Sequence, residues 1–373
     1  MLLSALTLLA SALSQRRHRH PSGAGGGRRR AQPFRPQVEQ LDDRLVPSTV
    51  GLSNAISINH TVYIGGIPYS WTERDWYTID QSSPAHQVVK FSGTTRHDLG
   101  GPGAIGEVSA SVDPQTGFGG AFALDDYGTI WWFNSAGTWS ALPGSYRAMC
   151  ATDDGHVYAV TNGGSDVLYL SSNGSATDLG APAAGIDSVS PYSLAASTGW
   201  FGGKNEAFAI GQNGAIYVNT ANAPGQWWLV DNSQFFWGLS AAQNDTLFAT
   251  TASGKLYEET EHIRLLSLGP YGPVWVFYWS GQDISGGRLY GTISADTDAS
   301  GAAEVYAIGQ DGNAYRYDQG SWAQMTSGVS VYDISGADGG YFYVVTDLPG
   351  PFQGWQYNPN LWNPWTYLGS NLS

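Results

Sequence analysis

The chain has 373 residues, of which 42% are hydrophobic, 13% aromatic and only 13% charged, and it contains 49 glycines and 15 tryptophans. This composition is typical of a turn-rich all-β protein and disfavours a helical one. The single cysteine, Cys150, excludes an intramolecular disulfide framework and a cysteine-rich metal site, so we expect Cys150 to be a small core residue.

The net charge of −14 is unevenly distributed along the chain. Residues 1–48 carry eight arginines against three acidic residues, so the acidic charge is concentrated in residues 49–373. An acidic surface repels phosphate backbones and anionic lipid, and nucleic acid is therefore not an expected partner.

Residues 1–48 are predicted to be a disordered head. The apolar run MLLSALTLLASALS has the length of a signal-peptide core and is too short to span a bilayer, although no basic residue precedes it. A basic, glycine-rich linker follows, and then VEQLDDRLVPS, residues 38–48. This segment resembles the LEQLEDRLVPS-like N-terminal segment of many exported planctomycete proteins. The resemblance implies a bacterial protein that is secreted or held in the cell envelope, with no transmembrane span.

Residues 49–373 contain a repeat. An apolar residue followed by two small residues recurs with spacings of 41, 45, 45, 45 and 50 residues, at 108–110, 149–151, 194–196, 239–241, 284–286 and 334–336, after a weaker copy at 56–58. An aromatic strand is expected after each copy, starting at residues 62, 121, 157, 207, 247, 305 and 341. A polar-glycine turn, a second aromatic strand and a strand of the form Trp-x-x-apolar complete the better copies.

Four short strands in each of seven units of about 45 residues predict a seven-bladed β-propeller, with six or eight blades as alternatives. Each terminal blade can be built from its own segment of chain. Bulky and small residues alternate in the second strand, as Phe208 and Ile210 do with Ala209 and Gly211, so neighbouring blades should interdigitate.

Two stretches, EAFAIGQNGAIYVN at 206–219 and EVYAIGQDGNAYRYDQGSWAQM at 304–325, resemble the repeats of tectonin-like and bacterial propeller lectins. The resemblance is clearest in the units that contain Phe122, Phe208 and Tyr306. It implies a lectin-like module, and such lectins bind sugars through tryptophan and tyrosine side chains between blades.

Sequence motifs for catalysis are mostly absent. The sequence has no GxSxG, HExxH, Walker or CxxC motif, and its seven histidines are scattered. We therefore expect a non-catalytic, monomeric binding module whose partner is a glycan or a cell-surface protein. A propeller hydrolase or lyase, or a protein-interaction scaffold, is the alternative, because carboxylates from distant blades can still meet.

Aromatic residues outside the expected strands are the candidate ligand contacts. Trp71, Trp76 and Tyr77 fall in an expected insertion of the first unit, and Trp200 and Phe201 fall in the sequence TGWFGG of the fourth. Exposed rings of this kind stack on sugar faces or on a partner protein, whereas rings that fold over the rim serve only packing.

One acidic loop is a candidate calcium site. Asp296, Asp298, Ser300 and Glu304 resemble the DxDxDGxxD loop of integrin-type propellers, with serine at the third ligand and glutamate at the fourth. Alternate oxygen ligands around a glycine turn suit a hard cation. The alternative is a solvated acidic loop.

Overall fold

The computed structural model describes residues 56–64, 67–80, 86–186, 193–197, 206–220, 223–242, 246–269, 272–298, 300–337, 340–346, 352–361 and 364–370. The side chains of residues 56–73, 263–277 and 369 are outside this description. The predicted head, residues 1–48, also lies outside the described residues.

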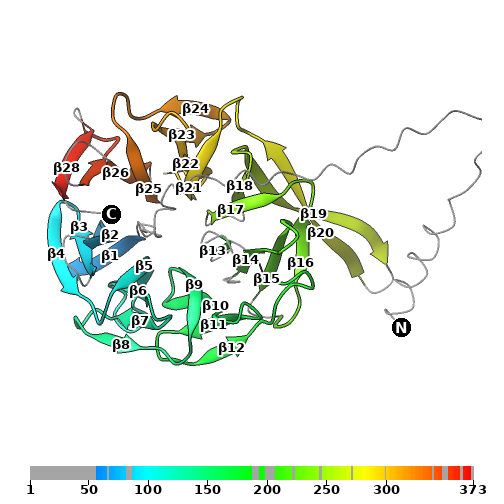
Figure 1. Ribbon diagram of the computed structural model, residues 1–373, viewed down its shortest axis with the longest axis horizontal. Helices are drawn as coiled ribbons and strands as arrows, with labels where there is room; N and C mark the ends of the chain where they lie inside the picture. The colour runs from blue at the N-terminus through cyan, green and yellow to red at the C-terminus, as the bar shows by residue number, and fades with distance from the viewer. Residues whose placement is uncertain are drawn as a thin grey trace, which may run out of the picture. The chain divides into compact units, whose positions relative to one another are not determined.

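Seven antiparallel sheets of four strands each form the described part of the chain, and in every sheet the strands neighbour one another in sequence order. The sheets are arranged as blades around a central axis (Figure 1). The predicted seven-bladed β-propeller is therefore confirmed, and the alternatives of six or eight blades are wrong. The described residues contain no helix, and hence none of the length and apolarity needed to cross a membrane.

The first four blades contain sixteen strands. Blade 1 consists of β1 (Ile56–Ile64), β2 (Ile67–Asp80), β3 (Gln87–Ser92) and β4 (Thr95–Gly100); blade 2 of β5 (Ile105–Val112), β6 (Gly119–Asp125), β7 (Ile130–Phe133) and β8 (Trp139–Ala141); blade 3 of β9 (Tyr146–Ala151), β10 (His156–Thr161), β11 (Val167–Ser171) and β12 (Ala176–Asp178); and blade 4 of β13 (Leu194–Ser197), β14 (Glu206–Ile210), β15 (Ile216–Thr220) and β16 (Trp228–Asp231).

The last three blades contain twelve strands. Blade 5 consists of β17 (Phe236–Ala241), β18 (Thr246–Thr251), β19 (Leu256–Gly269) and β20 (Gly272–Asp283); blade 6 of β21 (Tyr290–Thr297), β22 (Ala303–Gly309), β23 (Ala314–Asp318) and β24 (Ser321–Gln324); and blade 7 of β25 (Val331–Ala337), β26 (Tyr341–Thr346), β27 (Gln353–Tyr357) and β28 (Trp365–Ser370).

The alternation of bulky and small residues in the second strand packs one blade against the next. Phe208 and Ile210 of β14 enter a buried cluster with Phe236 of blade 5. On the other face of the same strand, Ala209 lies in a cluster with Tyr158 of blade 3. Each blade therefore presents large side chains to one neighbour and accepts those of the other, as the sequence predicts.

Serine residues of the innermost strands link neighbouring blades. The Ser109 Oγ accepts the backbone N–H of Ala151 at 3.1 Å, and Ser240 accepts that of Ala295 at 2.8 Å. Ser294 accepts the N–H of Gly336 at 2.9 Å. These crowded strands need side chains that are small and can also satisfy a buried donor, and serine meets both requirements.

The predicted repeat copy in blade 6 is wrong. Ser240 bonds to Ala295, and Ser294 bonds to Gly336, so residues 293–295 take the innermost position in this blade. The innermost strand is β21, which contains residues 293–295, whereas the predicted residues 284–286 lie in the connection before it. The cause is the hairpin β19–β20 of blade 5, which pairs as far as Gly269 opposite Gly272, well beyond the end of β18. This hairpin extends outward from the ring (Figure 1).

Blade 1 also departs from the prediction. Its second strand is β2, and the stretch beginning at Val62 belongs to β1. Trp76 and Tyr77 are therefore strand residues and not loop residues, and both are fully buried. Trp76 stacks on Phe91 of its own blade at 4.8 Å and on Tyr343 of blade 7 at 4.7 Å, so these rings close the propeller.

Candidate functional site

One face of the propeller is built from the turns between the second and third strands and from the connections that lead into the next blade. We call it the connection face. On it, the N–H of the first residue of an innermost strand donates to a turn glycine of the preceding blade: Tyr146 to Gly128, Phe236 to Gly214, Tyr290 to Gly254, and Val331 to Gly312. These glycines have positive φ, from 73° to 85°, which suits glycine best.

A β-bulge follows this hydrogen bond in several blades. The register shifts at the start of β5, β9, β17 and β25, which leaves Gly106, Arg147, Trp237 and Tyr332 as extra residues. In β21 the shift leaves two residues, 291 and 292, opposite one residue of β22. A bulge re-aims a side chain and releases it from the strand-to-strand packing. The innermost strands therefore carry unlike side chains at a similar place on the connection face.

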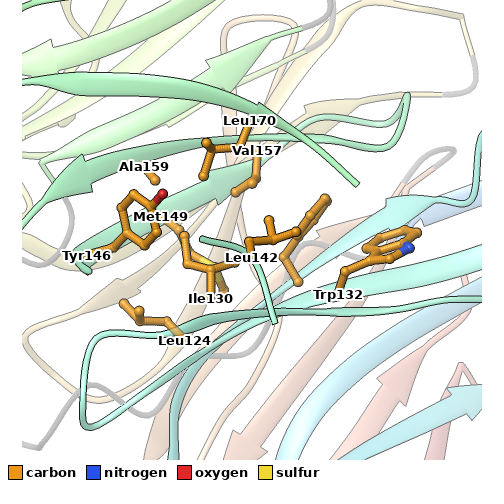
Figure 2. Packing of buried hydrophobic residues seen from close by; sticks show 10 residues of the cluster. Leu124, Ile130, Trp132, Leu142, Tyr146, Met149, Val157, Ala159 and Leu170 are labelled. Atoms are coloured by element: carbon orange, nitrogen blue, oxygen red, sulfur yellow. The ribbon is translucent and has the colours of Figure 1, made fainter. Parts of the chain in front are cut away.

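A cavity of about 280 Å³ opens between blades 2 and 3 on this face. Its lining residues are Gly106, Glu107, Leu124, Asp125, Asp126, Tyr127, Gly128, Tyr146, Arg147 and Asn162. Leu124 and Tyr146 also belong to the hydrophobic cluster between these blades, and they lie at the opposite end of it from Trp132 (Figure 2). The cavity thus has an apolar base and a polar wall.

Glu107 is the most unusual group in the cavity. Burial raises the pKa of its carboxyl group to about 8, although the backbone N–H of Met149 donates to the carboxylate and partly offsets the effect. The side chain therefore keeps its proton at neutral pH and can donate a hydrogen bond there.

Asp125 shapes the turn that carries Tyr127. Its carboxylate accepts the backbone N–H groups of Tyr127 and Thr129 at 3.0 and 2.8 Å and the indole N–H of Trp131 at 2.9 Å. The turn is thereby fixed from within, and the Tyr127 side chain is 81% exposed at the edge of the cavity. The Asn162 amide, on the blade 3 side, donates to Ser145 Oγ at 3.2 Å.

The structure rearranges the predicted aromatic contacts. The prediction that Trp76 and Tyr77 are exposed loop residues is wrong, because both are buried in β2. Trp71 lies in the same strand, but its side chain is outside the described residues. Trp200 and Phe201 also lie outside the described residues.

The predicted calcium loop uses its carboxylates for other contacts. Asp298 Oδ1 accepts the N–H groups of Ser300 and Ala302 at 2.7 and 2.9 Å. Glu304 is fully buried and is paired with Arg316 at 2.6 Å. Asp296 faces Glu304 across the two strands as a Cα partner. Within the described residues, no three His, Cys, Asp or Glu side chains gather closely enough to hold a metal ion.

Sequence reasoning missed Glu107, Tyr127 and Arg147 as site residues. The available signal was Glu107 itself, a charged residue directly before the repeat copy at 108–110 of an innermost strand. That Glu107 and Arg147 line the same cavity depends on the bulges and on the packing of two blades, which the repeat pattern does not reveal.

No family model matches the chain, and no curated protein matches it in sequence. Solved structures do resemble it. Human WBSCR16 is 10% identical with a TM-score of 0.52, covering 80% of this chain and 88% of that one. Virginiamycin B lyase from Staphylococcus aureus is 9% identical with a TM-score of 0.50, covering 79% and 94%. BBS1N in complex with ARL6DN is 12% identical with a TM-score of 0.50, covering 80% and 92%. At these identities the likeness shows the fold alone.

Proposed function

We propose that this protein is a secreted or envelope-associated binding module, without catalytic activity, that holds a glycan at the cavity between blades 2 and 3. The observation that carries the proposal is an exposed tyrosine ring, Tyr127, beside a polar cavity that also contains Asp126, Arg147 and Asn162. The resemblance of residues 38–48 to an export segment supports an extracytoplasmic location, where glycans are abundant.

The chemistry of this cavity suits a sugar. A pyranose ring has an apolar C–H face that packs on an aromatic ring and hydroxyl groups that need donors and acceptors. Tyr127 offers the ring, Arg147 and protonated Glu107 offer donors, and Asp126 offers an acceptor. The volume of about 280 Å³ is at the lower end of ligand pockets and fits one sugar unit of a longer chain.

A glycan array probed with the full chain tests the proposal. Tyr127→Ala should lower retention on the bound glycan about tenfold while the melting temperature stays within 1–2 °C, because the ring is exposed. The matched control is Tyr367→Ala, which removes a second exposed tyrosine, on β28. Equal retention of both variants, or no glycan bound by the wild type, would contradict the proposal.

Glu107 favours one alternative, a propeller hydrolase or lyase, because a carboxyl group that is protonated at neutral pH is a general-acid candidate. An activity screen on the polymers of the array separates the two. Turnover that is lost in Glu107→Gln would replace the binding proposal with the catalytic one.

Phe235 and Leu289 favour the other alternative, a protein-interaction scaffold. Both side chains are exposed, and both lie against turn glycines of the connection face, Gly214 and Gly254. Apolar side chains exposed on one face are typical of protein contacts. One of the similar structures, BBS1N, is described in complex with a protein, ARL6DN. A cell-surface protein bound through Phe235, and not through Tyr127, would favour this scaffold.

A further inference from the structure

Tryptophans at the outer strand of three blades seal the gap to the preceding blade in the same way. The indole N–H of Trp139 donates to the Leu99 carbonyl at 3.1 Å, and Trp227 donates to Leu179 at 3.0 Å. Trp322 donates to Ile284 at 2.6 Å. In each pair the acceptor residue lies at the end of the preceding blade, so the indole bridges two neighbours.

Trp365 of β28 occupies the corresponding place in blade 7, and Met325 corresponds to the acceptor residue in blade 6. The Met325 N–H donates to Ala314 in the third strand of its blade at 2.8 Å, as that of Ile284 does to Leu256 at 3.0 Å. Yet no hydrogen bond joins the Trp365 indole N–H to any described residue. Its ring packs instead against Phe342 and Tyr357, at 5.3 Å from each.

The space that the other indoles fill is open here. A cavity of about 230 Å³ lies between blades 6 and 7, lined by Met325, Thr326, Ser327, Val329, Val344, Thr346, Trp355 and Trp365. An engineered apolar cavity of about 150 Å³ binds benzene, so this volume accepts a substituted single ring.

The lining chemistry disfavours a polyhydroxylated ligand. Among the described residues, the lining contains no charged or amide side chain. The Thr326 hydroxyl already accepts the Ala314 N–H at 2.8 Å, and that of Thr346 donates to the Gln353 carbonyl at 3.4 Å. A sugar would leave most of its hydroxyl groups without partners, at a high cost in free energy. An aromatic ring with one polar atom leaves at most one hydrogen-bonding group without a partner, so its binding carries a much smaller free-energy cost.

We propose that this cavity is a binding site for a small phenol-like molecule, whose ring packs among Met325, Val344 and Trp355 and whose oxygen accepts the Trp365 N–H. The ligand oxygen takes the place that a main-chain carbonyl has beside the other three indoles. The site is independent of the cavity between blades 2 and 3.

The test is a calorimetric titration of the full chain with p-cresol and, separately, with toluene. The wild type should bind both, and p-cresol more tightly. Trp365→Phe keeps an aromatic ring but removes the donor, so p-cresol affinity should fall about two- to tenfold while toluene affinity stays the same. Val329→Phe fills the cavity from its partly exposed edge and should abolish binding of both compounds.

Trp139→Phe is the matched control, because it removes an indole N–H that already has a protein acceptor. It should lower the melting temperature and leave both affinities unchanged. The proposal is overturned if p-cresol gives no binding heat, if Val329→Phe binds it normally, or if Trp365→Phe weakens toluene as much as p-cresol. Glycan retention should be unaffected in all three variants.

Discussion

Glu107 follows the bulge of β5, whereas the residues that follow the bulges of β9 and β17 are the small residues Ala148 and Gly238. Blade 7 has a second buried carboxyl group at this place, because Asp333 follows the bulge of β25. A carboxyl group partly buried between two blades stays neutral because its charged form would lose hydration. Such a group is retained at a cost in stability, which is common at functional sites.

Replacing Glu107 should change how stability depends on pH. Its pKa of about 8 in the folded state lies above the ordinary 4.5, so the folded protein binds a proton that the unfolded chain has released. The resulting stabilisation is complete below about pH 4.5 and is lost as the pH rises through 8. Allowing for partial exposure, we expect a loss of about 1–3 kcal/mol over this range.

Melting curves of the wild type and Glu107→Gln from pH 4 to 9 measure this effect. The melting temperature of the variant relative to the wild type should rise with pH, because glutamine cannot ionise. Other carboxyl groups with raised pKa values, such as Glu259, remain in both proteins and cancel in the difference. A constant difference across this range would mean that Glu107 is ionised in the folded protein.

At the scale of the element, the hairpin β21–β22 shows why a calcium-like pattern arises. The Asp298 N–H donates to the Ala302 carbonyl at 2.7 Å while its carboxylate accepts N–H groups of the turn. Asp113 closes the equivalent hairpin of blade 2 in a similar way. Its N–H donates to the Phe118 carbonyl, and its carboxylate accepts the Gln115 N–H. An aspartate at this place is therefore explained by turn chemistry alone.

Calcium binding by Asp296, Asp298, Ser300 and Glu304 stays a prediction, and melting curves test it. If calcium binds, millimolar concentrations should raise the melting temperature modestly, and Asp298→Ala should remove the increase. In calcium-free buffer the structure predicts that Asp298→Ala lowers stability by about 0.5–2 kcal/mol, since the turn loses its acceptor. No shift up to 10 mM calcium, or an equal shift with magnesium, would rule the site out.

The sequence was informative about elements where packing imposes a pattern. Small residues beside the axis and alternating bulky residues identified six of the seven second strands correctly. The second strand of blade 1 was placed wrongly, because Val62 and Trp76 both begin aromatic stretches that look like strands. The alternation of bulky and small residues does not show which stretch is the second strand of the blade. The innermost strand of blade 6 was predicted too early in the sequence, because the repeat pattern contains no sign of the long hairpin β19–β20.

The candidate site was beyond the reach of the sequence. Glu107, Tyr127 and Arg147 come from two strands and a turn of two blades, and a bulge orients Arg147. A one-residue bulge reverses which way a side chain points without changing any motif. Exposure was equally hidden, since Trp76 and Trp228 are both tryptophans in strands, yet one is fully buried and the other is 45% exposed.

At the scale of the whole molecule, the ring closes through side chains. No strand is shared between blades 1 and 7, so their contact consists of packing that includes Trp76, Phe91 and Tyr343, with the Arg74 guanidinium 4.0 Å above the Tyr341 ring. A cation over an aromatic face adds to the stacking.

Trp76→Ala should therefore destabilise the whole propeller. Loss of a fully buried tryptophan costs about 3–5 kcal/mol, which corresponds to a fall of about 5–15 °C in the melting temperature. Trp228→Ala, which removes an exposed indole of β16, is the control and should change it little. An unchanged melting temperature with loss of glycan binding would instead support the exposed, ligand-contacting Trp76 expected from the sequence.

The unbroken order of strands within each blade bears on how the chain folds as it is made. Every sheet pairs neighbours in sequence, so a blade contains only short-range contacts and can form as soon as its four strands have left the ribosome. The stacking of Trp76 on Tyr343 joins opposite ends of the described chain and cannot form until blade 7 has been synthesised. Until then Trp76 and Phe91 have no partner from blade 7. A nascent chain therefore carries an uncovered aromatic surface on blade 1 through most of its synthesis. Of the seven blades, blade 1 is exposed for the longest time to chaperones that bind such surfaces.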